Sequence, residues 1–98
     1  MVKVGLLVRL EAKPEKAEAL AAFLASALPM AIEEAGTRQW YAVRFGPTSF
    51  GIFDTFDADE GRQAHIDGRI AAALMQHGPD LLAKTPTIER HDILAAKV

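Results

Sequence analysis

The chain has 98 residues, of which 50% are hydrophobic and 24% are charged, and its formal net charge is −2. This composition is typical of one soluble globular domain covering residues 1–98. The weak acidic balance argues against nucleic-acid binding, no apolar run is long enough to cross a membrane, and the lack of cysteine excludes disulfides and thiolate metal sites. No signal-peptide pattern is present, so we expect a cytoplasmic protein.

The first third of the chain predicts a strand followed by a helix. Residues 2–11 alternate between apolar and mixed positions, which favours a strand. Pro14 suits the first position of a helix, and apolar residues then recur at three- and four-residue spacing from Ala17 to Ile32. Pro29 interrupts this stripe, so we expect either a kink near Leu28 or a second short helix. Gly36 is the expected C-terminal cap.

Two strands joined by a short turn are expected next. Residues 39–45 and 49–56 are rich in aromatic and β-branched side chains, and the turn residues Gly46-Pro47-Thr48 separate them. Such a short connection predicts an antiparallel hairpin.

A second helix is expected directly after this hairpin. Asp57 and Glu60 have the spacing of a capping box, so the helix is predicted to begin where the strand ends. It is predicted to run from about Ala58 to Gln76 and to stop at Gly78-Pro79.

Two glycines lie inside that second helix, at Gly61 and Gly68. Each weakens a helix by roughly 1 kcal/mol relative to alanine. They either allow another element to approach closely or are merely tolerated.

The order of these elements predicts the fold class. Residues 87–96 form the last expected strand, which gives the order β-α-β-β-α-β. This is the ferredoxin-like α+β pattern, with a four-stranded antiparallel sheet and two helices on one face. Apolar residues on both sheet faces, notably Leu7, Phe50 and Phe53, predict a homodimer that packs sheet against sheet.

His65 is the best single candidate for chemistry. It lies in the second helix, beside Ile66 at the edge of the apolar stripe, and its imidazole can exchange a proton near neutral pH. It either contacts a substrate or is a structural histidine at a helix edge. Arg62 and Arg69 share its helix edge, where they either assist an oxyanion or form a solvated basic face.

Aromatic strand residues are the candidate walls of a ligand site. Trp40 and Tyr41 are adjacent in a strand and so point to opposite faces. Trp40, Phe53 and Phe56 either line a cavity or are ordinary core or interface aromatics. Arg44 shares a face with Trp40 and needs a carboxylate partner if that face is covered, for which the candidates are Asp54, Glu89 and Asp92.

Motifs for other chemistries are missing from the sequence. The three histidines are scattered and match no metal-binding spacing, so we expect no metal site. No glycine-rich phosphate loop, dinucleotide fingerprint or nucleophile elbow is present.

The pattern as a whole resembles the antibiotic biosynthesis monooxygenase domain, a family of dimeric α/β barrels. The resemblance covers nearly the whole chain, and the alanine-histidine pair of the second helix is its most diagnostic local match. The segments that carry it are Val4–Leu10, Lys13–Lys16, Gly36–Tyr41, Phe53–Asp57 and Glu60 with Ala64-His65.

This resemblance implies an activity. Some relatives oxidise phenols, quinols or anthrones with molecular oxygen and without a metal or bound cofactor, while others degrade haem. The better-understood members rely on an asparagine, and this chain has none, so haem degradation is not expected. The expected function is cofactor-independent oxidation of a small aromatic substrate, with His65 as base or hydrogen-bond partner and Trp40, Phe53, Phe56 and Arg69 as substrate contacts. The alternatives are a barrel that binds a small apolar metabolite without chemistry, or a purely structural role.

Overall fold

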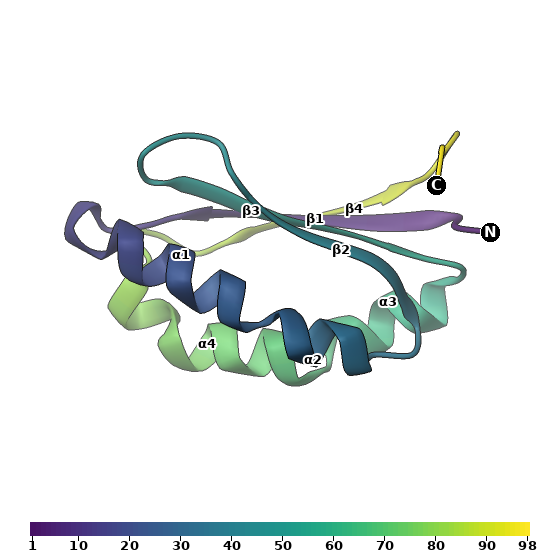
Figure 1. Ribbon diagram of the computed structural model, residues 1–98, viewed down its shortest axis with the longest axis horizontal. Helices are drawn as coiled ribbons and strands as arrows, with labels where there is room; N and C mark the ends of the chain where they lie inside the picture. Colours follow the sequence, from purple (N-terminus) through teal and green to yellow (C-terminus); the bar gives the residue numbers. More distant parts are fainter.

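The computed structural model describes all 98 residues, and it places every helix on one face of a four-stranded antiparallel sheet (Figure 1). This confirms the predicted ferredoxin-like α+β fold. The elements in chain order are β1 (Val4–Glu11), the 3₁₀ turn η1 (Pro14–Lys16), α1 (Ala17–Ser26), α2 (Leu28–Glu33), β2 (Thr37–Arg44), β3 (Ser49–Phe56), α3 (Asp59–Ile66), α4 (Arg69–Leu81) and β4 (Thr87–Asp92).

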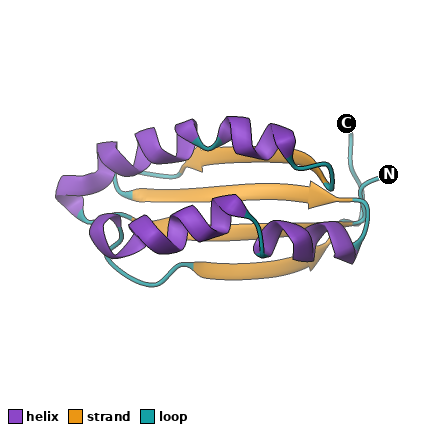
Figure 2. Ribbon diagram, turned by 90° about the horizontal axis from the view of Figure 1, so that it is seen from below, coloured by secondary structure: helices purple, strands orange, loops and turns teal.

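The sheet has the strand order β2-β3-β1-β4, so the first strand is one of the two central strands. Figure 2 shows the helices lying across this sheet. Leu6 of β1 pairs with Asp54 of β3 on one side and with Arg90 of β4 on the other. Because side chains alternate between faces, every second residue of these strands points at the helices. The buried apolar core lies there, and its largest members include Leu6, Leu10, Leu20, Leu24, Phe50 and Phe56.

The other face of the sheet carries a row of stacked rings. Phe53 stacks on Tyr41 with ring centroids 6.4 Å apart and on His91 at 5.5 Å. The His91 ring covers Gly5, where a Cβ would lie only 2.2 Å from Nε2. We call this side, with no helix over it, the outer face. The predicted apolar side chains on both sheet faces are confirmed, because Phe53 lies on the outer face while Phe50, three positions away, points at the helices.

The first helical region consists of two helices, which is one of the two alternatives predicted. A break at Ala27 separates α1 from α2, and Pro29 lies in the first turn of α2, where its missing N–H costs nothing. The expected cap at Gly36 is wrong, because no glycine has a positive φ and α2 ends at Glu33. Gly36 instead contacts Gly61 of α3, and a Cβ on Gly61 would lie 2.9 Å from the Gly36 carbonyl oxygen. The close-approach interpretation of Gly61 is therefore confirmed.

The second helical region starts where it was predicted to, at about Ala58, but its predicted cap is wrong. The N-cap of α3 is Ala58, which has no capping side chain. The Asp57 carboxylate lies 3.5 Å from the N-terminal ammonium and 3.7 Å from Arg38 Nε, so it pairs with those cations rather than with helix amides.

The length of that helix differs from the prediction in two ways. An extended Gly68 separates α3 from α4, which allows both His65 and Ile70 to be buried. At the far end, α4 continues through Gly78 and Pro79 to Leu81. Packing of an apolar face supplies most helix stability, and Leu81 and Leu82 are both buried in the core.

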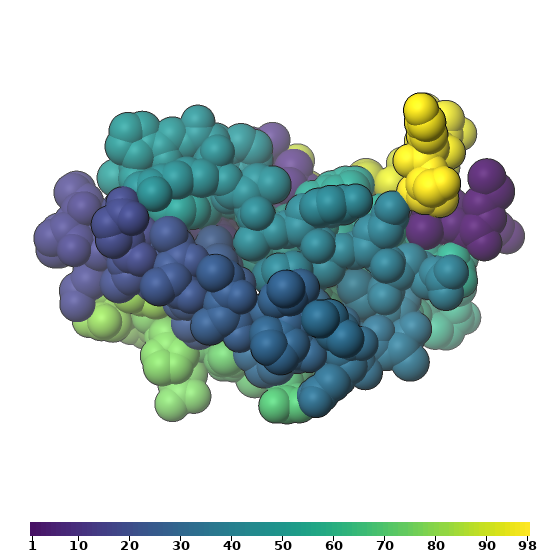
Figure 3. All heavy atoms as spheres, viewed as in Figure 1, coloured from purple at the N-terminus to yellow at the C-terminus, as the bar shows by residue number.

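The last strand is shorter than expected, because β4 ends at Asp92. The C-terminal residues extend away from the body of the molecule, as the yellow spheres of Figure 3 show. Leu94 and Val98 are almost fully exposed there. None of the helices combines the length and the apolar character needed to cross a lipid bilayer.

Candidate functional site

A cavity of about 490 Å³ lies between α4 and the helix-facing side of the sheet. Its helix wall has Ile70, Leu74 and Gly78 on one face of α4, where residues four apart are neighbours, with the last residue of α3 and the residue after α4 at its ends. The complete helix wall is Ile66, Ile70, Leu74, Gly78 and Leu82, and the sheet wall consists of Leu6, Val8, Ile52 and Ile88. The size and apolar lining are typical of a site for a small organic ligand.

His65 lines this cavity, and two carboxylates hold its ring. Nδ1 lies 2.6 Å from Oε1 of Glu34, and Nε2 lies 2.8 Å from Oδ2 of Asp54. The exposed fractions of the three side chains are 6% for His65, 20% for Glu34 and 0% for Asp54. Glu34 follows α2, Asp54 belongs to β3 and His65 belongs to α3, so three elements meet at this point. We call these residues the carboxylate–imidazole cluster.

The cluster favours a protonated ring. Burial opposes the charged form, but the hydrogen bonds and negative charges of Asp54 and Glu34 outweigh it and raise the pKa of His65 to about 9. Burial raises the pKa of Asp54, and the hydrogen bond and positive charge of the His65 ring offset this only in part. With both carboxylates ionised, the cluster has one positive and two negative charges.

This arrangement limits what His65 can do. A group with a pKa of about 9 is already protonated at neutral pH, and both ring nitrogens face a carboxylate oxygen. The geometry therefore supports a charged hydrogen-bond donor better than a free base. Phe56 packs against the ring with centroids 5.6 Å apart, and Thr37 Oγ1 donates to the same Glu34 oxygen at 2.8 Å. These contacts fix the orientation of the cluster.

The structure separates the other residues expected at the site. Phe56 is fully buried behind His65, and Trp40 faces the helices on β2, where it lines a second, smaller pocket against α1. Phe53 lies on the outer face and so cannot reach the cavity. Arg69 is exposed on α4 and pairs with Glu33 at 3.0 Å. None of these four side chains lines the cavity that contains His65.

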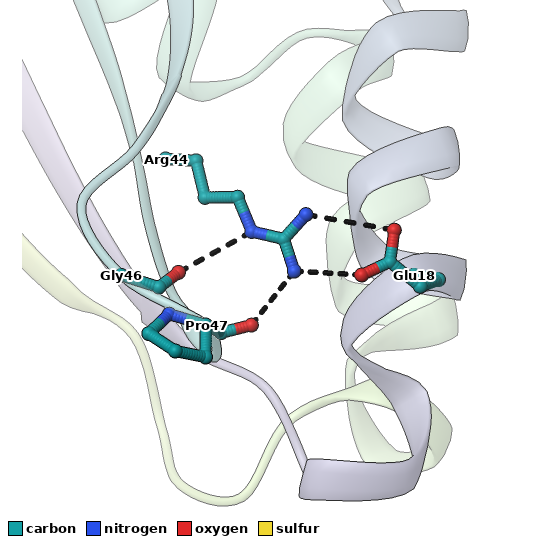
Figure 4. Close-up of polar contacts among 4 residues, drawn as sticks. All are labelled: Glu18, Arg44, Gly46 and Pro47. Carbon is teal, nitrogen blue, oxygen red and sulfur yellow. Dashed lines mark hydrogen bonds and ion pairs between the residues drawn. The ribbon is translucent and has the colours of Figure 1, made fainter.

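Two arginines have structural partners. Arg44 reaches from the end of β2 to Glu18 of α1, with Nη2 2.7 Å from Oε2, and also donates to the Gly46 and Pro47 carbonyls (Figure 4). An ion pair was expected for Arg44, but with other partners. Arg62 donates to the carbonyls of Gly5 and His91, which attaches α3 to the edge of the sheet.

Sequence reasoning missed the two acidic members of the cluster. Asp54 had a detectable signal, because it alternates with Phe50, Ile52 and Phe56 and is the one charged residue on that inward-facing row. Glu34 had no comparable signal in the sequence, since it lies in a loop 31 positions from His65. No group of three histidine or acidic side chains is arranged to hold a metal ion.

Comparison with solved structures identifies a relative for the chain. A protein of unknown function from Nitrosomonas europaea, NE2512, has 56% sequence identity and a TM-score of 0.98 over 100% of this chain and 95% of its own. No family model and no curated protein matches the sequence.

More distant structures share the fold. A second protein from Nitrosomonas europaea, titled "Putative antibiotic biosynthesis monooxygenase", has 17% identity and a TM-score of 0.84 over 94% of this chain and 99% of its own. A protein of the same description from Caulobacter crescentus has 20% identity and a TM-score of 0.79 over 96% and 92%. The chain therefore belongs to the family of the NE2512 protein and has the fold of the antibiotic biosynthesis monooxygenase-like proteins.

Proposed function

We propose that this protein oxidises a small aromatic molecule, such as a phenol, quinol or anthrone, with molecular oxygen and without a metal or bound cofactor. One observation carries the proposal. The carboxylate–imidazole cluster lies at one end of a cavity whose other walls are almost entirely apolar. The fold it shares with proteins named as monooxygenases supports the same reaction class.

The cluster can supply the proton transfer that such a reaction needs. An aromatic substrate reacts with oxygen only after it loses a proton and becomes an electron-rich anion. The cluster carries one more negative than positive charge, and burial raises the pKa of Asp54, so an added proton neutralises the cluster and ends on that carboxylate. His65 is the one member of the cluster that lines the cavity, so the proton passes to Asp54 through its ring, and one ring nitrogen must exchange its carboxylate partner for the substrate oxygen during this transfer.

The remaining steps need no further reactant. The substrate anion passes one electron to oxygen, and the resulting radical pair combines to form a peroxide anion. This anion takes back the proton held by the cluster and becomes a hydroperoxide. Loss of water from an anthrone hydroperoxide leaves a quinone, so one oxygen atom enters the product and the other leaves as water. The substrate supplies all the electrons, and the apolar walls Leu6, Ile66 and Leu74 protect the anion from solvent.

A second candidate function is binding of a small apolar molecule without turnover. The observation that favours it is the engagement of both His65 nitrogens by carboxylates, which is also the geometry of a purely structural ion pair.

An oxygen-electrode assay over a panel of quinols and anthrones distinguishes the two functions. With an accepted substrate, we expect His65→Gln to lower oxygen consumption by roughly 10² to 10⁴ fold, the usual contribution of a proton-transfer group. His77→Gln, on the exposed side of α4, is the matched control. Because His65→Gln leaves two carboxylates unpaired, the double variant His65→Gln/Asp54→Asn serves if the single one fails to fold. Full activity in either folded variant would remove the cluster from the mechanism, and binding without oxygen uptake would support the second candidate.

We also propose that the protein is a homodimer, as expected from the sequence. The outer face supports this, because Tyr41, Val43 and Phe45 are exposed there beside the partly buried Phe53. Aromatic side chains gathered on an uncovered sheet are typical of an interface between subunits.

A further inference from the structure

The two ends of the His65 cavity differ in charge. The cluster forms one end, where Asp54 pairs with Leu6 in the sheet register. The loop between α4 and β4 forms the other end, where Lys84, Thr85 and Pro86 line the cavity.

These ends are far apart. Ala83 of the loop donates its N–H to the Glu11 carbonyl, so the loop lies level with the last residue of β1. The five residue-to-residue steps of strand from Leu6 to Glu11 span about 17 Å at the usual rise of a strand. A ligand of two or three fused rings is shorter than this, so it fits lengthwise between the two ends.

Lys84 is available to such a ligand. The neighbouring lysines are occupied, since Lys13 donates to the Pro79 carbonyl and Lys16 pairs with Asp80, whereas Lys84 forms no ion pair or hydrogen bond. Its charge reaches Glu11 only at longer range, as the smallest of the causes that lower the pKa of that carboxyl. The nearest carboxylate along the strand is that of Glu11, whose two oxygens already accept from the hydroxyls of Thr48 and Ser49. Glu11 also follows the buried, helix-facing Leu10 and therefore points to the outer face.

We infer that the cavity binds an elongated aromatic acid, with its carboxylate at Lys84 and Thr85 and its uncharged end at the carboxylate–imidazole cluster. This inference rests on the proposal that the cavity is the ligand site, and it adds the substrate class and the direction of binding. The two carboxylates of the cluster repel an acid that enters the other way round, while Lys84 attracts it. The reacting ring carbon is thereby placed beside His65.

Binding of anthracene-2-carboxylate and of its uncharged primary amide tests the inference. The two probes have almost the same shape and are fluorescent, so the dissociation constant of each can be measured by fluorescence anisotropy. We expect the wild-type protein to prefer the carboxylate by about tenfold, the effect of one partly exposed charge-assisted contact. Lys84→Met should abolish the preference, and Lys97→Met, in the exposed C-terminal segment, should retain it.

A further variant locates the bound probe. Ala71→Phe places a large side chain into the cavity wall and should weaken both probes equally. Equal affinity of wild-type protein for the two probes, a preference that survives Lys84→Met, or no binding of either probe would overturn the inference. The assay involves no turnover. A charge preference without oxygen uptake on any substrate would therefore leave this inference intact while refuting the proposed monooxygenase activity.

Discussion

The stability of this fold should fall as the pH rises from 6 to 9, because the protein folds around a charged His65. The pKa of that ring is raised from the ordinary histidine value of 6.5 to about 9, so the folded state holds a proton that the unfolded chain releases. A raised pKa stabilises the fold fully below the unfolded value, and this contribution is lost as the pH passes the folded value.

The size of the effect follows from the two pKa values. Each pKa unit corresponds to about 1.4 kcal/mol, so the shift of His65 contributes about 3 kcal/mol at pH 5 to 6. Nearly all of it should disappear by pH 9.5. The ring is only 6% exposed, so solvent screening reduces this figure little.

Urea unfolding at several pH values measures this loss. The protein concentration must stay fixed, since association would also change the apparent stability. The double variant His65→Gln/Asp54→Asn is the reference, because it lacks the titrating ring and does not leave the buried Asp54 carboxylate without a partner. We expect the wild-type free energy of unfolding to decrease by about 3 kcal/mol relative to the variant. Parallel curves for the two proteins would refute the charged state assigned to the cluster.

Two further predictions concern packing and assembly. Gly61→Ala should destabilise the protein by roughly 1–3 kcal/mol, because the new Cβ meets the Gly36 carbonyl. Gly78→Ala, whose Cβ would have its nearest neighbour 3.6 Å away, should instead stabilise the protein by up to about 1 kcal/mol. Thermal unfolding compares the two variants, and equal effects would contradict the close contact between Gly36 and Gly61. Sedimentation at micromolar concentration should give twice the chain mass for the wild-type protein. A folded Phe53→Asp variant should give the single-chain mass, because a charge on the outer face opposes burial in an interface of about 1,600 Å². A monomeric wild-type protein would contradict the dimer.

The position of helix boundaries shows where local patterns stop being informative. Asp57 and Glu60 match a capping box, yet Asp57 pairs with the N-terminus and Arg38, which come from distant parts of the chain. The Gly78-Pro79 pair is a strong stop signal, but burial of Leu81 outweighs it. Both outcomes depend on partners that a local window of sequence does not contain.

The sequence by itself determined the fold class and the presence of His65 on a helix edge. Alternation and helical periodicity are local, and the order of the elements leaves few antiparallel arrangements. Only the tertiary structure decided which face of β3 is covered, and thus that Phe50 is core while Phe53 is not. It also brought Glu34 and Asp54 to His65, because three elements must pack before these charges meet. The chemistry of the ring depends on those two carboxylates, so it follows from packing rather than from sequence spacing.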